Sequence, residues 1–233
     1  LGSALVRGTR KDETNNFEVL VGGLPLEYFQ LVLSGKAPLR GSVDFIGKIQ
    51  GVSWIPKGHV RIRDVWYGTQ PFGSGSIRIT ESNDRMWYDG EIPELISIDG
   101  WSGYGLDQDW MVKIATQHFP LHTLYPVSFS DAWVESELTG VGVIEQRDHT
   151  LMGTVNVEES VVRWSERQIS TEHPWVIGWH DQDLELSETH VIGDGQTDFY
   201  VSGQIKQGVP DFTSRGQIDL RVLDMLLEGT RQS

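Results

Sequence analysis

The chain has 233 residues, and its 19 Lys and Arg against 33 Asp and Glu give a formal net charge of −14. This length suits one large or two small domains with a sizeable core, and the acidic balance argues against a surface that binds nucleic acid or an anionic membrane. Cysteine is absent, which excludes disulfides, thiol nucleophiles and Cys-ligated metal sites.

Apolar and polar residues alternate in many short runs, which predicts β-strands with one apolar and one polar face. The runs are residues 43–49, 60–62, 76–80, 154–157, 183–186, 199–205 and 217–222. Dipeptides typical of tight turns separate them, namely Lys57-Gly58, Asn83-Asp84, Asp89-Gly90, Asp99-Gly100, Asp194-Gly195 and Gln207-Gly208. The sequence therefore predicts an all-β protein built on an antiparallel sheet.

Helical patterns are short. A helix is expected near residues 25–34, which begin with Pro, and another near residues 220–228, where Leu recurs along one stripe. A similar helical turn is expected after Pro120. Because each turn is followed by strands at near-equal spacing, we expect two β repeats, residues 1–119 and 120–233.

Several segments resemble the TamB and AsmA-like envelope proteins of Gram-negative bacteria. The resemblance lies in residues 23–29 (GLPLEYF), 39–43 (LRGSV), 71–79 (PFGSGSIRI), 175–179, 184–186, 199–205 and 216–220. It implies a long, curved antiparallel sheet that forms an open, apolar-lined groove (a β-taco), with short helices between repeats. It also implies a non-catalytic lipid conduit of the translocation and assembly module type.

Such a conduit would act in outer-membrane biogenesis and phospholipid transport across the periplasm. The resemblance implies phospholipid acyl chains and an outer-membrane β-barrel as partners, and a place in the cell envelope with any inner-membrane anchor outside this chain. No cofactor and no nucleic acid are expected.

A single sheet with one apolar face must cover that face with a second layer, close on itself or bind a guest. If the guest is a lipid, we expect the groove to be lined by Val43, Phe45, Ile62, Ile77, Ile79, Val155, Val157, Leu184, Leu186, Phe199, Val201 and Ile205. If a second layer covers the face, the alternative is a carbohydrate-binding β-sandwich module whose Trp side chains stack on sugars. A jelly-roll enzyme is the third hypothesis.

No pattern of residues supports catalysis or a metal site. His173, His180 and His190 have Asp181 and Asp183 nearby, but a solvated strand face explains these carboxylates, so no metal ligands are expected.

Other carboxylates have similarly simple explanations. Glu135 and Glu137 share a strand face, as strand carboxylates ordinarily do, and Asp194 and Asp198 flank a turn without the ligand spacing of a calcium loop.

Nine Trp residues spread along the chain instead of clustering: Trp54, Trp66, Trp87, Trp101, Trp110, Trp133, Trp164, Trp175 and Trp179. Packing inside the protein, a place at the rim of an apolar groove and stacking on sugar rings remain open for them.

Overall fold

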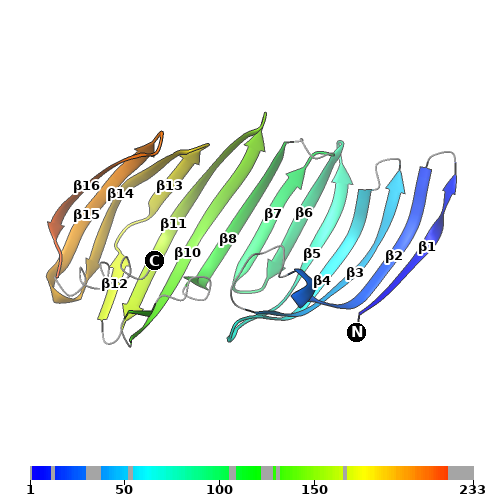
Figure 1. Cartoon of the computed structure of the whole chain (residues 1–233), viewed down its shortest axis with the longest axis horizontal. Helices are drawn as coiled ribbons and strands as arrows, with labels where there is room; N and C mark the ends of the chain where they lie inside the picture. The colour runs from blue at the N-terminus through cyan, green and yellow to red at the C-terminus, as the bar shows by residue number, and fades with distance from the viewer. Residues whose placement is uncertain are drawn as a thin grey trace. The chain divides into compact units, whose positions relative to one another are not determined.

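The computed structural model describes residues 2–11, 14–29, 38–51, 55–104, 109–121, 128–129, 132–164 and 167–219. The described residues are nearly all β, as predicted, and form one long antiparallel sheet (Figure 1). Hydrogen-bonded neighbours follow the order of the chain with two exceptions: β9 pairs only with β10, which follows β8 in the sheet, and β12 and β13 both lie between β11 and β14.

Two compact units divide the chain within strand β8 (Trp110–Pro120). The N-terminal unit comprises residues 1–114 and 147–149, and the C-terminal unit comprises residues 115–146 and 150–233. The border predicted from the sequence, between residues 119 and 120, falls at the end of β8. That residues 1–119 and 120–233 are repeats of each other stays a prediction.

The N-terminal unit contains seven complete strands and the first part of β8. They are β1 (Ser3–Lys11), β2 (Thr14–Pro25), β3 (Leu39–Gly51), β4 (Ile55–Tyr67), β5 (Gln70–Ser82), β6 (Arg85–Ile92) and β7 (Ile96–Ser102). A bulge in β2 between Val21 and Leu24 keeps both side chains on one face of the sheet, since Val21 pairs with Phe45 and Leu24 with Val43.

The C-terminal unit contains the rest of β8 and the strands up to β16. They are β9 (Ser128–Phe129), β10 (Ala132–Arg147), β11 (Thr150–Trp164), β12 (Arg167–Thr171), β13 (Trp175–His180), β14 (Asp183–Gly193), β15 (Thr197–Lys206) and β16 (Val209–Gln217). A bulge in β14 lies between Leu186 and Thr189, where the Ser187 hydroxyl accepts a hydrogen bond from the Val176 backbone N–H at 2.8 Å.

Three predicted turns are correct and three are wrong. Asn83-Asp84, Asp194-Gly195 and Gln207-Gly208 join consecutive strands and have positive φ angles at one or both residues. Lys57-Gly58, Asp89-Gly90 and Asp99-Gly100 instead lie inside β4, β6 and β7. Gly58, Gly90 and Gly100 occur there because the neighbouring strand leaves no room for a Cβ atom.

The helical predictions are borne out only as a short turn within the described residues. Leu26–Phe29 forms a 3-10 helix, η1, after Pro25, which ends β2. The remainder of segment 25–34, most of the turn after Pro120 and segment 220–228 lie outside the described residues. The alternating run 217–222 overlaps the predicted helix near residues 220–228, so that both a strand and a helix were possible there; β16 ends at Gln217, and Ile218 and Asp219 have no regular structure.

No helix among the described residues is long and apolar enough to cross a bilayer.

Candidate functional site

One face of the N-terminal unit is apolar across its whole width. Directly paired residues of an antiparallel sheet share a face, so the register defines rows that run across the strands. The first row is Ala4, Val21, Phe45, Val60, Ile77, Gly90 and Ile98; the second is Val6, Val19, Gly47, Gly58, Ile79, Tyr88 and Gly100. Neighbouring strands lie about 4.8 Å apart, so rows across seven strands extend over roughly 29 Å.

This apolar face is not covered by another layer of described residues. Leu26, at 9% exposure, is the only described hydrophobic side chain of the unit that is buried. Val6 is 59% exposed, whereas Phe45, Val60 and Ile77 are half-buried, as expected for side chains shielded mainly by neighbours in their own sheet.

All the residues of this unit that were predicted to line a groove lie on the apolar face. Val43 pairs with Ile62, Phe45 shares a row with Ile77, and Ile79 lies in the second row. Five further residues lie on this face but were not predicted to line it: Val19, Val21, Val60, Tyr88 and Ile98. Residues 19–21 read Val-Leu-Val, and this run hides the alternation because Leu20 belongs to the opposite face.

The C-terminal unit has an apolar face of its own. One row is Val155, Ile177, Leu186, Gly203 and Phe212, and the next is Gly153, Trp179, Leu184, Ile205 and Pro210. Along β15, Phe199, Val201, Gly203 and Ile205 alternate onto this face. The register therefore places the predicted residues Val155, Val157, Leu184, Leu186, Phe199, Val201 and Ile205 together, while their contact with lipid stays a prediction.

One part of the C-terminal unit is packed more closely. Val157 is fully buried, and Val134 and Trp164, each 8% exposed, form a small core with Val162, Ile169 and Ile218. Ile218 follows β16, so the chain turns back over the sheet there. Thr197 accepts a hydrogen bond from the Asp219 backbone N–H at 3.3 Å, which fixes this return.

The opposite face of the N-terminal unit is mostly polar but contains an apolar patch. Leu5, Leu20 and Ile46 share one row and are 43%, 44% and 60% exposed. They line an open pocket of about 440 Å³ together with Arg61 and Arg63 of β4.

Asp44 lies at the same pocket and is held by several donors. Its carboxylate accepts a hydrogen bond from the Gly23 backbone N–H at 2.9 Å and pairs with Arg63. The hydrogen bond from Gly23, followed by the attraction of Arg63, lowers the pKa of Asp44 despite the opposing effect of desolvation.

A charged cluster marks one end of the apolar face. Glu81 at the end of β5 accepts a hydrogen bond from the Tyr104 hydroxyl at 2.8 Å and pairs with Lys57. Desolvation, followed by the hydrogen bond to Glu81, raises the pKa of Tyr104 to about 12, so the phenol remains a donor at neutral pH. Polar groups thus border the apolar face at this end of β5.

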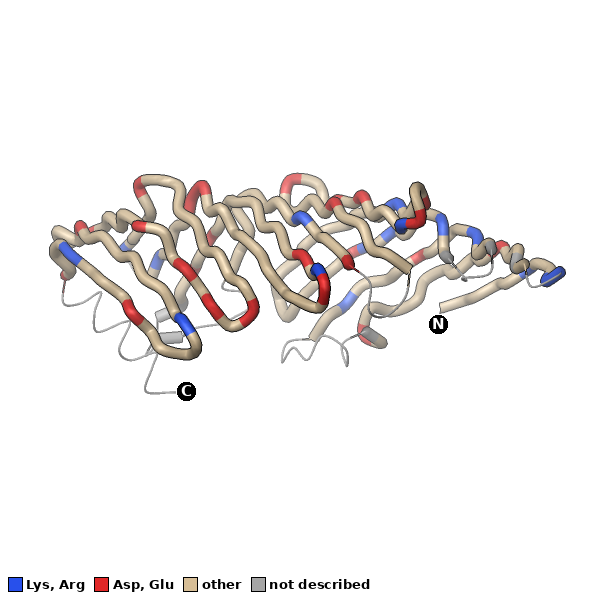
Figure 2. Tube along the Cα trace, turned by 90° about the horizontal axis from the view of Figure 1, so that it is seen from above, with Lys and Arg blue, Asp and Glu red and all other residues tan. Residues whose placement is uncertain are grey.

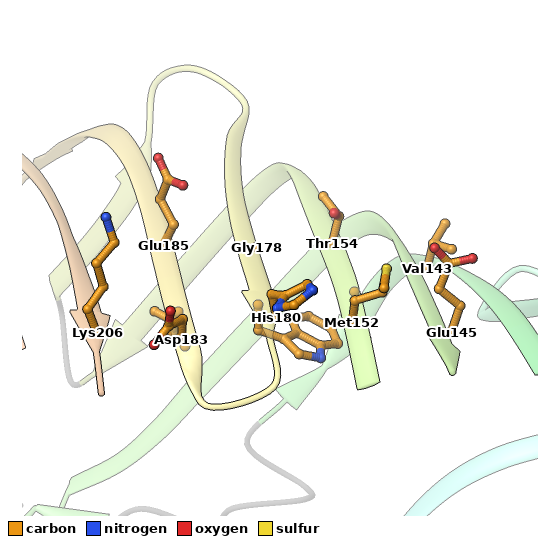
Figure 3. A pocket seen from close by; sticks show the side chains of 12 residues that line it. Val143, Glu145, Met152, Thr154, Gly178, His180, Asp183, Glu185 and Lys206 are labelled. Atoms are coloured by element: carbon orange, nitrogen blue, oxygen red, sulfur yellow. The ribbon is translucent and has the colours of Figure 1, made fainter. Parts of the chain in front are cut away.

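The polar face of the C-terminal unit has a pocket of about 530 Å³ around Gly178 (Figure 3). Met152, His180 and Asp183 form one row beside it, Thr154, Gly178 and Glu185 form the next, and Lys206 of β15 also lines the pocket. A Cβ atom at Gly178 would meet nothing within 4 Å, which explains the hollow. The pocket lining combines carboxylates, His180 and Lys206 with apolar side chains such as those of Val143 and Met152.

The histidines are brought together differently from the prediction. His173 and His190 lie close to each other and to Glu172, with ring centroids 6.3 Å apart. His180 lies instead beside Asp181, and Asp183 accepts a hydrogen bond from the Gln207 backbone N–H. Glu172 was not predicted to take part, because this grouping depends on the bend between β12 and β13.

His190 also contacts carboxylates on both sides of its ring. Its Nε2 lies 2.8 Å from Oδ1 of Asp198, and its Nδ1 contacts Glu172. The hydrogen bond to Asp198, followed by the interactions with Glu172, raises the pKa of His190 against the effect of desolvation.

The carboxylates considered for catalysis or calcium have structural partners. Glu137 accepts a hydrogen bond from Arg163 at 3.2 Å, whereas Glu135 is exposed. Asp194 accepts a hydrogen bond from the Gln168 backbone N–H at 2.7 Å. Asp198 lies on β15 and contacts His190 instead of facing the turn.

The described Trp side chains mostly pack within the protein. Trp66, at 41%, is the only exposed Trp side chain in the described part of the chain. Trp87 pairs directly with Trp101, whose ring is covered by the Arg85 guanidinium at 3.7 Å. Trp179 lies over Gly153 on the apolar face. The side chains of Trp54 and Trp133 lie outside the described residues.

Comparisons with family models, with curated proteins and with solved structures find no match for this chain.

Proposed function

We propose that the chain binds lipid acyl chains on the apolar faces of its sheet and is a non-catalytic segment of a lipid conduit. The observation that supports this most strongly is the pair of unbroken apolar rows across β1 to β7, which no described layer covers. Water-exposed apolar area of this extent commonly marks an interaction surface.

The dimensions suit an acyl chain. The rows extend over roughly 29 Å, whereas the acyl chains of one leaflet occupy about half of a ~30 Å hydrocarbon core. Each CH₂ group removed from water contributes about 0.8 kcal/mol. The rows run from strand to strand, so a chain could slide along them while its polar headgroup remains in water.

We further propose the physiological setting that the family resemblance implies. On this hypothesis the segment shields phospholipid tails during transport across the periplasm of a Gram-negative cell, in outer-membrane biogenesis, with an outer-membrane β-barrel as a partner. The carbohydrate-binding β-sandwich gains no comparable support, because the described strands form one sheet and Trp101 is covered by Arg85.

The test is lipid extraction and native mass spectrometry of protein purified without detergent. We expect co-purified phospholipid with the wild type and its loss from a Phe45→Asp variant. The matched control is Ile46→Asp, because Ile46 is the next residue of β3, lies on the opposite face and is 60% exposed. Asp44 is a poor control, since its carboxylate binds Gly23 and Arg63.

Circular dichroism should show the same β content in the Phe45→Asp and Ile46→Asp variants. If Phe45→Asp does not fold, Val60→Thr provides a milder change on the same apolar face. Lipid-free wild-type protein, or equal lipid in the Phe45→Asp and Ile46→Asp variants, would contradict the proposal. Sugar binding by lipid-free protein would favour the alternative module.

A further inference from the structure

The bend between β12 and β13 brings two histidines and a glutamate together. One ligand atom from each of Glu172, His173 and His190 lies within 4.8 Å of the other two. Nε2 of His173 is 3.6 Å from Oε2 of Glu172, and the same oxygen contacts Nδ1 of His190. Two imidazole nitrogens and one carboxylate oxygen therefore converge on a small volume.

Backbone structure fixes this convergence. The Glu172 backbone N–H donates a hydrogen bond to the His190 carbonyl at 3.0 Å, which extends the β12–β14 ladder by one residue. Pro174 follows His173 and interrupts the strand, because Pro lacks the N–H that a ladder needs. Glu172 and His173 thus stand in a bend beside His190.

The His190 ring is held in one orientation. It stacks on Tyr200 with centroids 4.1 Å apart and an interplanar angle of 5°, and its side chain is only 11% exposed. Nε2 lies 2.8 Å from Oδ1 of Asp198, which as a carboxylate accepts a hydrogen bond from Nε2–H, and a metal ion bound at Nδ1 would take the place of a proton on that nitrogen. Nδ1 is buried against Glu172, but this contact lacks hydrogen-bond geometry.

We infer that Glu172, His173 and His190 bind a divalent transition-metal ion, with Zn²⁺ as the ion that this donor set fits best. Imidazole and carboxylate groups are common Zn²⁺ ligands at bond lengths of about 2.0–2.2 Å. Asp198 acts as a positioning residue, since metal-ligating His side chains commonly donate their other N–H to a carboxylate. His173 is 73% exposed, so its side chain can rotate to close the site.

The surrounding charge favours a cation. The C-terminal unit contains 6 Lys and Arg against 18 Asp and Glu, whereas the N-terminal unit contains 13 against 15. Figure 2 shows the acidic residues along the strands and turns of the C-terminal unit. Such a field raises the local concentration of cations. His190 and Tyr200 share a row on the polar face, so this site is independent of acyl-chain binding on the apolar face.

The test is Zn²⁺ titration of the full chain, prepared without a histidine tag, in competition with a chromophoric chelator near neutral pH. We expect one tight site in the wild type and an affinity lower by roughly tenfold or more in a His173→Ala variant. His180→Ala is the matched control, because His180 is also exposed, at 66%, and lies 3.9 Å from the carboxylate of Asp181. This variant should bind Zn²⁺ like the wild type.

His190→Ala should also lose Zn²⁺ binding, but removal of this largely buried ring can affect folding. The decisive variant is therefore His173→Ala, because His173 is exposed. Asp198→Asn should weaken binding less than loss of a ligand. Absence of tight Zn²⁺ binding by the wild type, or equal affinity in the wild type and His173→Ala, would overturn the inference. In that case His190 serves only to pair with Glu172 and Asp198.

Discussion

The ring of Phe45 in β3 lies over Gly58 in β4, so that a Cβ atom at Gly58 would stand 3.0 Å from Cε2 of Phe45. The same hypothetical atom would stand 2.6 Å from the Cα of Gly47, the cross-strand partner of Gly58. An aromatic ring thus fills the space above a pair of glycines and keeps the apolar face continuous. Phe17 above Gly8 and Trp179 above Gly153 show similar arrangements.

Gly58→Ala should therefore destabilise the protein by roughly 1–3 kcal/mol, because the added methyl group displaces both the ring and the neighbouring backbone. Chemical denaturation measures the change. Gly22→Ala is the control in the same sheet, since its Cβ would lie 3.4 Å from the Ser3 hydroxyl, an ordinary contact. Equal stability of the two variants would show that the ring and the glycines are not tightly packed.

Asp44 should make the stability of the protein depend on pH. Its pKa is lowered in the folded state, mainly by the Gly23 hydrogen bond, so its ionised form stabilises the fold above the ordinary carboxyl pKa and this contribution is lost as pH falls through the folded-state pKa. Asp44→Asn should melt at a lower temperature than the wild type at about pH 7, and the difference should shrink towards about pH 2. A difference independent of pH would contradict this assignment.

Tyr104 should titrate above the ordinary pH range of a tyrosine side chain. Because its pKa is raised to about 12, ultraviolet difference spectra of the wild type minus Tyr104→Phe should show a phenol that ionises near that pH. The unfolded chain releases this proton at lower pH, so the stability contributed by neutral Tyr104 is lost as pH rises above about 10. A midpoint near the ordinary tyrosine value would mean that the contact with Glu81 does not persist in solution.

Lipid binding by the C-terminal unit can be tested separately from that of the N-terminal unit. Val201→Asp places a charge on its apolar face, whereas Ser202→Asp changes the adjacent residue of β15 on the other face. We expect reduced phospholipid co-purification only for Val201→Asp, because a buried carboxylate opposes acyl-chain contact. Similar retention in both variants would limit the lipid-binding proposal to the N-terminal unit.

Alternation of residue types was sufficient to predict the strands around Phe45, Ile77, Leu184 and Val201 and the face on which each side chain lies. It failed where glycine has a packing role. Gly58, Gly90 and Gly100 were interpreted as turn residues, but their conformation is extended and their lack of a side chain accommodates a neighbouring strand. Only the pairing of strands distinguishes these two uses of glycine.

The candidate metal site was harder to predict than the apolar faces. The face of the sheet on which a side chain lies follows from the alternation of residue types within one strand. The proximity of His173 to His190 depends instead on where β12 ends and on how β12 and β14 are paired. Both histidines stand close in sequence to His180, and all three were considered together, but the structure places His180 beside Asp181. A local pattern could not reveal which of the three would meet.

The order of the strands also bears on how the polypeptide folds. Nearly every strand pairs with one that is close in sequence, and even β13 lies between its near neighbours β11 and β14. Contacts of short sequence separation require little loop closure and favour rapid folding. A chain that emerges N-terminus first can therefore add one hairpin after another to a growing edge, without waiting for a distant segment to arrive.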